Sequence, residues 1–148
     1  MTAKIDELDQ KILETMMGGY GVGAKMTELA SGLSESRSTI NLRVSKLQEK
    51  GVISGYKPDI DWSKLGYDLL AYVGTVCPDE FVGDLVNVLK DEDTVYEVWE
   101  VMTGTFDILM KCRFKDYSEI SKLHDLIMSV SGIREVDIWL LGPCRKCK

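Results

Sequence analysis

The sequence predicts an α+β protein in which a helix-turn-helix precedes a ferredoxin-like domain with the element order βαββαβ. Apolar residues recur at helical spacing up to residue 53, and from about Leu69 strand-like alternation appears between two helical segments. In addition, Lys and Arg gather on one short segment, although the formal net charge of the 148-residue chain is −6. The expected organisation is a helix-turn-helix at 1–53, a hairpin or linker at 54–68, a ferredoxin-like part at 69–142 and a cysteine-containing tail at 143–148.

The first helix is expected to run from Asp6, which can cap it, to about Met17. Its apolar residues share one face: Leu8, Ile12, Leu13 and Met16. The glycine-rich residues 18–23 then end the helix. They do not form a phosphate loop, because a helix rather than a strand precedes them and no Lys-Ser/Thr pair follows the last glycine. We interpret them as a connector.

A helix-turn-helix is expected next. Thr27 can cap a second helix over residues 28–33, and Ser36 can cap a third, which stops before Gly51. In the third helix one buried stripe is formed by residues at i, i+4 and i+7: Ile40, Val44 and Leu47. The turn between the two helices has about three residues, as in a helix-turn-helix. A packed helical hairpin without a DNA partner is the alternative.

The outward face of the third helix suits a DNA major groove, where Ser and Asn reach base edges while Arg and Lys contact phosphates. Residues 36–57 hold five basic side chains and one carboxylate, and such a local patch can outweigh an acidic total. Leu42 is an exposed apolar exception that could meet a thymine methyl group. The predicted DNA-binding residues are Ser36, Arg37, Ser38, Thr39, Asn41, Leu42, Arg43, Ser45 and Lys46.

The C-terminal part reads as alternating strands and helices. Strands are expected at residues 69–76, 94–102, 106–114 and 134–141, and helices at 80–91 and 117–132. Alternation along the second strand places Tyr96, Val98 and Met102 on one side, with Val95, Trp99 and Val101 on the other. Both faces of the sheet would then be apolar. The two helices would cover only one of these faces, so we expect a partner subunit on the other and hence a homodimer at least.

Several motifs resemble the Lrp/AsnC family of feast/famine transcription regulators: LDQKILETM, TELASGL, the block RVSKLQEKGVISGY, WSKLGY and VMTGTFDILMK. The similarity spans essentially the whole chain in the family's order. It implies a winged helix-turn-helix, a hairpin at GVISGYKPDID that links the domains, and dimers through the regulatory sheet. It also implies assembly into tetramers or octamers, and amino-acid effectors bound between dimers.

The resemblance places the effector loop on Met102, Thr103, Gly104, Thr105, Phe106 and Asp107. Gly104 would permit a tight turn whose amides could hold a carboxylate, and Asp107 could accept a ligand ammonium group. Many relatives have an acidic residue where Thr105 stands. The family also commonly has a small or apolar residue at Glu35 and Pro at Arg37. These departures leave the effector's identity open.

The tail carries a Cys-x-x-Cys pair, Cys144 and Cys147. This spacing is half a zinc site or a dithiol switch, and inert reduced thiols are the third reading. A complete zinc site would need Cys77, Cys112 or a second subunit. The single histidine, His124, lies within a predicted helix and is expected at the surface or in packing rather than as a ligand.

Two other functions compete with regulation of transcription. Siroheme decarboxylases have the same two-domain plan, but here the second strand has no His or Arg, and no catalytic set of side chains is apparent. The other alternative is an effector sensor that does not bind DNA. The sequence has neither an apolar run long enough to span a membrane nor a signal-peptide pattern. A cytoplasmic protein without a required cofactor is therefore expected.

Overall fold

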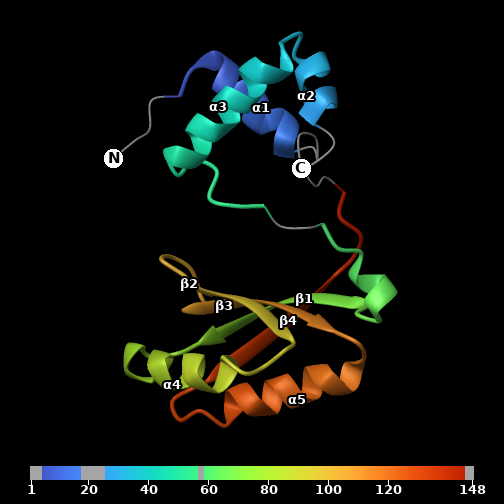
Figure 1. Ribbon diagram of the computed structural model, residues 1–148. Coiled ribbons are helices and arrows are strands. Elements are labelled where there is room, and N and C mark those ends of the chain that lie inside the picture. Colours follow the sequence, from blue (N-terminus) through green and yellow to red (C-terminus); the bar gives the residue numbers. More distant parts are fainter. Residues whose placement is uncertain (1–4, 18–25, 57–58, 146–148) are drawn as a thin grey trace. The chain divides into compact units, whose positions relative to one another are not determined.

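The computed structural model describes residues 5–17, 26–56 and 59–145. The chain divides between Asp59 and Ile60 into two compact units (Figure 1). Within the described ranges, no helix has the length and hydrophobicity that a membrane span requires.

Three helices make up the first unit: α1 (Glu7–Met17), α2 (Met26–Gly32) and α3 (Arg37–Glu49). Their fully or almost fully buried apolar residues form one small core, namely Ile12, Leu29, Ala30, Ile40, Val44 and Leu47. The predicted apolar stripe of α3 thus faces inward, and the helix-turn-helix is confirmed.

The start of α2 differs from the expectation. Thr27 is the second residue of this helix, which begins at Met26, so Thr27 does not cap it. The helix also ends at Gly32, and residues 33–36 form the turn to α3. A capping side chain is only one of several helix-start signals. The burial of Leu29 and Ala30 in the shared core is compatible with a helix that begins earlier.

The segment after α3 contains no strand in residues 50–56 or 59–61. The chain turns at Gly51, which has φ +70°, and the amides of the next two residues both donate to the carbonyl of Leu47 at 2.9 and 3.2 Å. The hairpin that the resemblance implied, and with it the wing, is therefore not formed by the described residues. A strand needs a neighbour for its N–H and C=O groups, and the described part of this chain provides none here.

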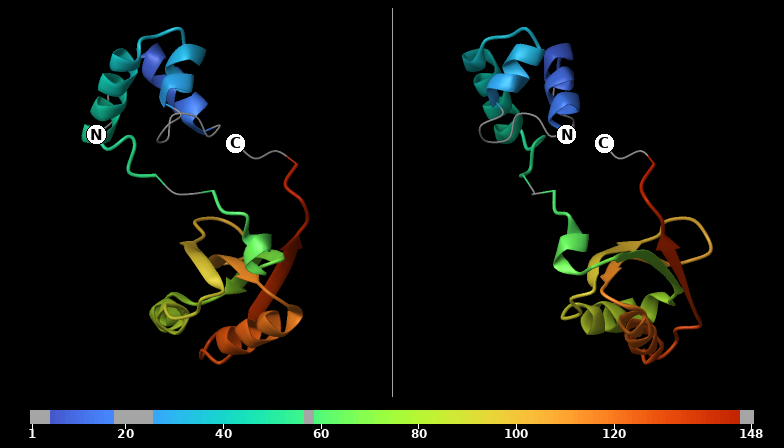
Figure 2. Two further views of the ribbon diagram at one scale, coloured as in Figure 1. Left: turned by 45° about the vertical axis from the view of Figure 1, so that its right-hand side comes forward. Right: turned by 90° about the vertical axis from the view of Figure 1, so that its right-hand side faces the viewer.

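The second unit has the element order β1 (Leu69–Val76), α4 (Asp79–Leu89), β2 (Val95–Glu100), β3 (Ile108–Phe114), α5 (Tyr117–Met128) and β4 (Glu135–Leu141). Its four strands form an antiparallel sheet of order β2-β3-β1-β4. Both helices cover the same face of this sheet (Figures 1 and 2). The predicted ferredoxin-like fold is confirmed. The sheet face without helices is called the open face below.

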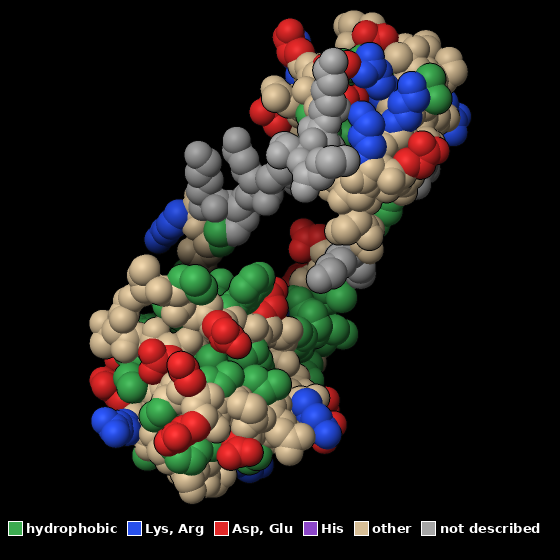
Figure 3. Space-filling view, turned by 90° about the vertical axis from the view of Figure 1, so that its left-hand side faces the viewer, with side chains coloured by type: hydrophobic (Ala, Val, Ile, Leu, Met, Phe, Trp, Pro, Cys, Tyr) green, Lys and Arg blue, Asp and Glu red, His purple; other side chains and the backbone are tan. Residues whose placement is uncertain are grey.

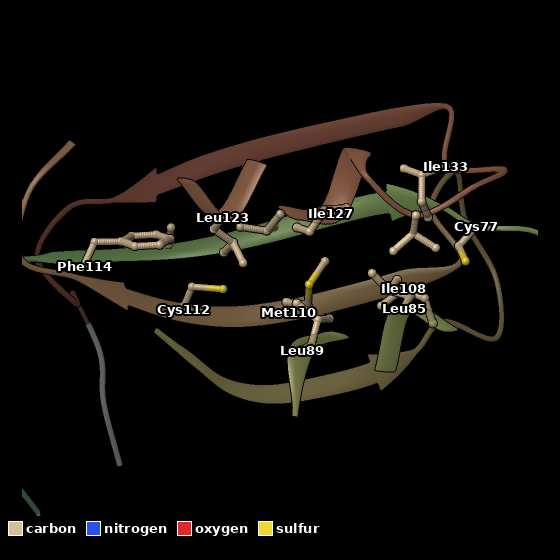
Figure 4. Packing of buried hydrophobic residues seen from close by; sticks show 13 residues of the cluster. Cys77, Leu85, Leu89, Ile108, Met110, Cys112, Phe114, Leu123, Ile127 and Ile133 are labelled. Atoms are coloured by element: carbon tan, nitrogen blue, oxygen red, sulfur yellow. The ribbon is translucent and has the colours of Figure 1, made fainter. Parts of the chain in front are cut away.

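The core of this unit lies between the sheet and the two helices (Figure 4). Alternate residues of β3 are completely or almost completely buried there: Ile108, Met110, Cys112 and Phe114. Leu85 of α4 and Leu123 of α5 close over them. This strict alternation is what a strand shows when one of its faces is covered by helices.

A β-bulge changes the faces that β2 presents. Tyr96 is an extra residue, because its two neighbours pair with adjacent positions of β3. Val95 and Val98 consequently share the helix-covered face, while Trp99 lies on the open face. The predicted grouping of Val95 with Trp99, and of Tyr96 with Val98, is wrong because simple alternation assumes an unbroken ladder.

An aromatic cluster ties the segment before β1 to the open face. Trp62 begins a 3-10 turn, η2 (Trp62–Leu65), and its ring lies 4.9 Å from the ring of Tyr96 in an edge-to-face arrangement. The guanidinium of Arg113 lies 5.0 Å from the centre of the Trp62 ring. Such cation–π and edge contacts position the chain that enters the sheet.

Candidate nucleic-acid interface and effector loop

The recognition helix α3 starts at a well-formed cap. Ser36 has an extended backbone, and its hydroxyl oxygen accepts a hydrogen bond from the Thr39 amide at 3.1 Å. The same oxygen lies 3.0 Å from the hydroxyl of Ser38 and 2.7 Å from that of Thr39. Three hydroxyl groups therefore share one hydrogen-bonded cluster at the positive end of the helix dipole.

Seven of the nine predicted DNA-binding side chains are exposed on α3 or at its cap: Ser36, Arg37, Ser38, Asn41, Leu42, Ser45 and Lys46. Leu42 is 56% exposed although it is apolar. Thr39 and Arg43 are only partly exposed. Since Ile40, Val44 and Leu47 are buried, the polar face is held outward by the packing of the opposite face.

The structure gives Arg43 a different partner from the predicted phosphate. Its guanidinium pairs with the carboxylates of Asp6 and Asp9 at the start of α1. The hydrogen bond that Asp6 accepts from the Asp9 amide, together with the guanidinium, holds the pKa of the Asp6 carboxyl below its ordinary value. The predicted phosphate contact of Arg43 stays a prediction, because the ion pair engages a side chain that is still 34% exposed. Its side chain connects α3 to α1.

This connection involves a reciprocal cap that the sequence reasoning missed. The Asp9 amide donates to the Asp6 carboxylate at 2.9 Å, and the Asp6 amide donates back to the Asp9 carboxylate at 3.3 Å. The side chain of Asp9 is only 8% exposed, so its charge needs a partner. The available signal was the pair of aspartates three residues apart at a predicted helix start.

A hollow of about 200 Å³ lies beside this ion pair, between α1 and α3. It is lined by Asp6, Asp9, Arg43, Lys46, Leu47 and Lys50. Figure 3 shows Lys and Arg side chains gathered on one face of the first unit, whereas Asp and Glu stand among hydrophobic side chains on the second. On the face shown there, basic side chains therefore gather on the unit that carries the predicted recognition helix.

The predicted effector loop joins β2 to β3 and projects from the sheet. Residues 102–105 are exposed, Met102 to 92%. Gly104 has φ +137°, which a residue with a side chain rarely adopts. A backbone hydrogen bond from the Val101 amide to the Asp107 carbonyl at 2.8 Å closes the loop at its base, and the Asp107 amide donates to the carbonyl of Thr75 in β1 at 3.0 Å.

Two residues of the predicted effector loop have partners within the fold. One carboxylate oxygen of Asp107 accepts a hydrogen bond from the Cys77 amide at 2.9 Å, so this side chain holds β1 to the loop. Phe106 packs edge-to-face on Trp139, with 5.2 Å between the ring centres. Both rings lie over Gly74, where a Cβ atom would stand 2.9 Å from each. The loop is thereby connected to the open face.

The cysteines fall into two classes. Cys77 and Cys112 are buried free thiols, and burial raises the pKa of Cys112 to about 12. The described residues contain no cluster of three metal-binding side chains. Cys144 is exposed and disulfide-bonded, whereas Cys147 lies outside the described residues. His124 is partly exposed, and its ring Nδ1 lies 3.4 Å from a carboxylate oxygen of Asp125.

Comparison with known sequences relates both units to regulators. Residues 78–140 match the Lrp/AsnC ligand binding domain. The chain is 32% identical over 133 residues to the HTH-type transcriptional regulator FL11 of Pyrococcus horikoshii, which covers 90% of this chain and 86% of the relative. It is 33% identical over 118 residues to the regulatory protein AsnC of Haemophilus influenzae, covering 78% and 76% of the two chains.

Solved structures agree with these sequence matches. AsnC of E. coli superposes with a TM-score of 0.78 at 26% identity, over 99% of this chain and 97% of that one. The transcriptional regulator NMB0573 of Neisseria meningitidis, solved as a complex with L-Met, gives a TM-score of 0.82 at 20% identity, over 97% and 93% of the two chains. The second comparison establishes the shared fold.

Proposed function

Since this chain belongs to the Lrp/AsnC family of HTH-type transcriptional regulators, we propose that it binds duplex DNA through the exposed face of α3. We also propose that a small molecule bound at the β2–β3 loop alters its DNA affinity or its assembly. The observation that carries the first part is the polar, exposed surface of α3, which stands opposite the buried stripe Ile40, Val44 and Leu47.

The proposed DNA contacts divide by chemistry. Asn41 and Ser45 are short, exposed and polar, so they suit base edges, and Leu42 suits a thymine methyl group. Lys46 lies on the flank of this face and suits a phosphate. Ser36 and Thr39 stand at the N-terminus of α3, where hydroxyl and amide groups favour a phosphate, whereas Ser38 shares the outward row of Leu42 and Ser45. Arg43 acts indirectly, because it holds α3 against α1.

An amino acid is the proposed class of effector. The match to the ligand binding domain covers the β2–β3 loop, and a structural relative was solved with L-Met. In residues 102–106 no amide donates to another backbone group of the described chain, so these amides are available to a carboxylate. Asp107 is exposed, and the Cys77 amide donates to only one of its two carboxylate oxygens. The other oxygen could accept a hydrogen bond from an ammonium group of the effector.

Self-association through the open face is proposed as well. Trp99 is 59% exposed there, and Trp139 and Leu141 also expose large apolar surfaces. Exposed apolar patches of this kind are commonly covered by a partner. A homodimer formed by this face, with tetramers or octamers as higher assemblies, would bury these side chains.

The test is selection of bound sequences from a random duplex library by the purified protein, with and without a panel of amino acids. We expect one enriched motif with two-fold symmetry, and a change in Kd or in the mass measured by light scattering with at least one amino acid. Binding that depends on salt alone, without any enriched sequence, would contradict the DNA part of the proposal. An enriched motif that no amino acid affects would contradict only the effector part.

A further inference from the structure

We propose that Arg37 reads a guanine in the major groove, and that α3 enters the groove by its N-terminal two turns. This inference rests on the proposed DNA binding and adds to it the kind of base and the orientation of the helix. It changes the expected role of Arg37, which on sequence alone would contact phosphate.

Arg37 is placed and free to reach a base. It is the first residue of α3, and the N-terminal residues of a helix-turn-helix recognition helix are those that meet base edges. Its side chain is exposed, and the described residues make no ion pair or side-chain hydrogen bond with it. Its neighbour Ser38 is already hydrogen-bonded to Ser36 at 3.0 Å. The guanidinium, by contrast, presents a free pair of parallel donors.

The other arginine of α3 is in the opposite situation. Arg43 is held by Asp6 and Asp9, and release of its guanidinium would leave the nearly buried Asp9 carboxylate without its cationic partner. The two arginines, six residues apart on one helix, therefore have separate tasks. A guanidinium pairs bidentately with O6 and N7 of guanine, which is the commonest specific contact of arginine in the major groove.

The charge along the exposed face fixes how α3 can enter. Ser38, Leu42, Ser45 and Glu49 follow at i, i+4, i+7 and i+11 and so form one row opposite the buried stripe. The row is uncharged up to Ser45 and ends in an exposed carboxylate. If the whole helix lay deep in the groove, Glu49 would approach the phosphates and be repelled. An inclined helix, inserted by its N-terminal half, keeps this carboxylate outside.

The spacing within this half predicts part of the half-site. Arg37 and Asn41 are four residues apart, which corresponds to about 6 Å along the helix axis. Base pairs are stacked about 3.4 Å apart, so on an inclined helix the two side chains reach bases that are at most about two steps apart. Asn pairs bidentately with adenine. We therefore expect a guanine and an adenine within about two base pairs of each other in each half-site.

The experiment is selection from a random duplex library with the wild-type chain, Arg37→Ala, Arg37→Lys and the control Lys46→Ala, each first shown to unfold at the wild-type temperature. We expect Arg37→Ala to lose the guanine from the motif and keep the adenine. On the wild-type site, Kd should rise about 5- to 150-fold. Arg37→Lys keeps the charge but lacks the paired N–H donors of a guanidinium, so it should discriminate poorly between guanine and the other bases. Lys46→Ala should keep the motif and lower the salt slope by about one unit.

A second readout uses 7-deazaguanine, which lacks the N7 acceptor, at the guanine position. It should weaken binding by the wild-type chain about tenfold and leave the Kd of Arg37→Ala unchanged. The inference is overturned if the wild-type motif has no guanine, or if Arg37→Ala keeps the motif and loses affinity equally for all sequences. If the wild-type chain enriches no motif, the proposed DNA reading itself fails, and this inference fails with it.

Discussion

The contact between the β2–β3 loop and the open face can be tested by replacing Gly74 with alanine. A Cβ atom at this position would stand 2.9 Å from Cγ of Phe106 and 2.9 Å from Cη2 of Trp139. Overpacking of this kind costs about 1–3 kcal/mol. The lower chain entropy of alanine offsets about 0.5–1 kcal/mol of that. We expect Gly74→Ala to lower the free energy of unfolding of the second unit by about 0.5–2 kcal/mol.

The matched control is the same change in α4. Gly83 lies within this helix, and a Cβ atom there would meet nothing within 4 Å. Because glycine is disfavoured in a helix, Gly83→Ala should stabilise the unit by about 0.5–1 kcal/mol. The two variants should therefore change the free energy of unfolding in opposite directions, although the chemical change is identical. This difference separates local crowding from a general effect of alanine.

The assay is urea unfolding followed by circular dichroism, at two protein concentrations because the open face is also the proposed dimer surface. Tryptophan fluorescence provides a second readout, since Trp139 must shift to admit the new methyl group. If Gly74→Ala were as stable as Gly83→Ala, with unchanged fluorescence, Phe106 and Trp139 would not pack over Gly74 as described. The proposed connection between the loop and the open face would then be refuted.

Arg43→Ala should destabilise the first unit. Because the pKa of Asp6 is lowered in the folded state, the stability that this ion pair contributes should be present above about pH 4 and be lost as the pH falls through the folded pKa. Equal unfolding temperatures for the variant and the wild type at pH 7 would contradict the pairing. Asn41→Ala should change sequence preference, by about 1–3 kcal/mol at one base pair; equal loss on every sequence in fluorescence anisotropy would argue against base reading there. Cys77 and Cys112 should resist a thiol reagent at pH 8 until the chain unfolds, because burial raises both pKa values; rapid labelling of either in the folded chain would disprove their burial. We propose that oxidation of the tail cysteines modulates DNA binding. Oxidised glutathione takes two protons and two electrons from two thiols, so Cys144→Ser/Cys147→Ser should remove any difference in the Kd for DNA between reducing buffer and oxidised glutathione. A wild-type Kd that is identical in both buffers would contradict this proposal.

Local patterns in the sequence were sufficient for the elements and their order. The spacing of Ile40, Val44 and Leu47 predicted which face of α3 is buried, because a helix repeats every 3.6 residues whatever it packs against. Ser36 predicted where that helix begins, because its hydroxyl bonds to an amide three residues away. Alternation and helical spacing after Leu69 likewise predicted βαββαβ. All of these depend on residues that are near neighbours in the chain.

Tertiary structure decided which partners distant residues take. Arg43 was expected at a phosphate, but it lies against the start of α1, 34 and 37 residues earlier, and pairs with two carboxylates there. The bulge at Tyr96 depends on the register with β3, and one extra residue exchanges the faces of all that follow. Asp107 has the Cys77 amide as its partner only because β1 and the β2–β3 loop meet at one end of the sheet. Charge and periodicity show that a side chain is polar or exposed; which group neutralises it depends on contacts that only the folded chain brings together.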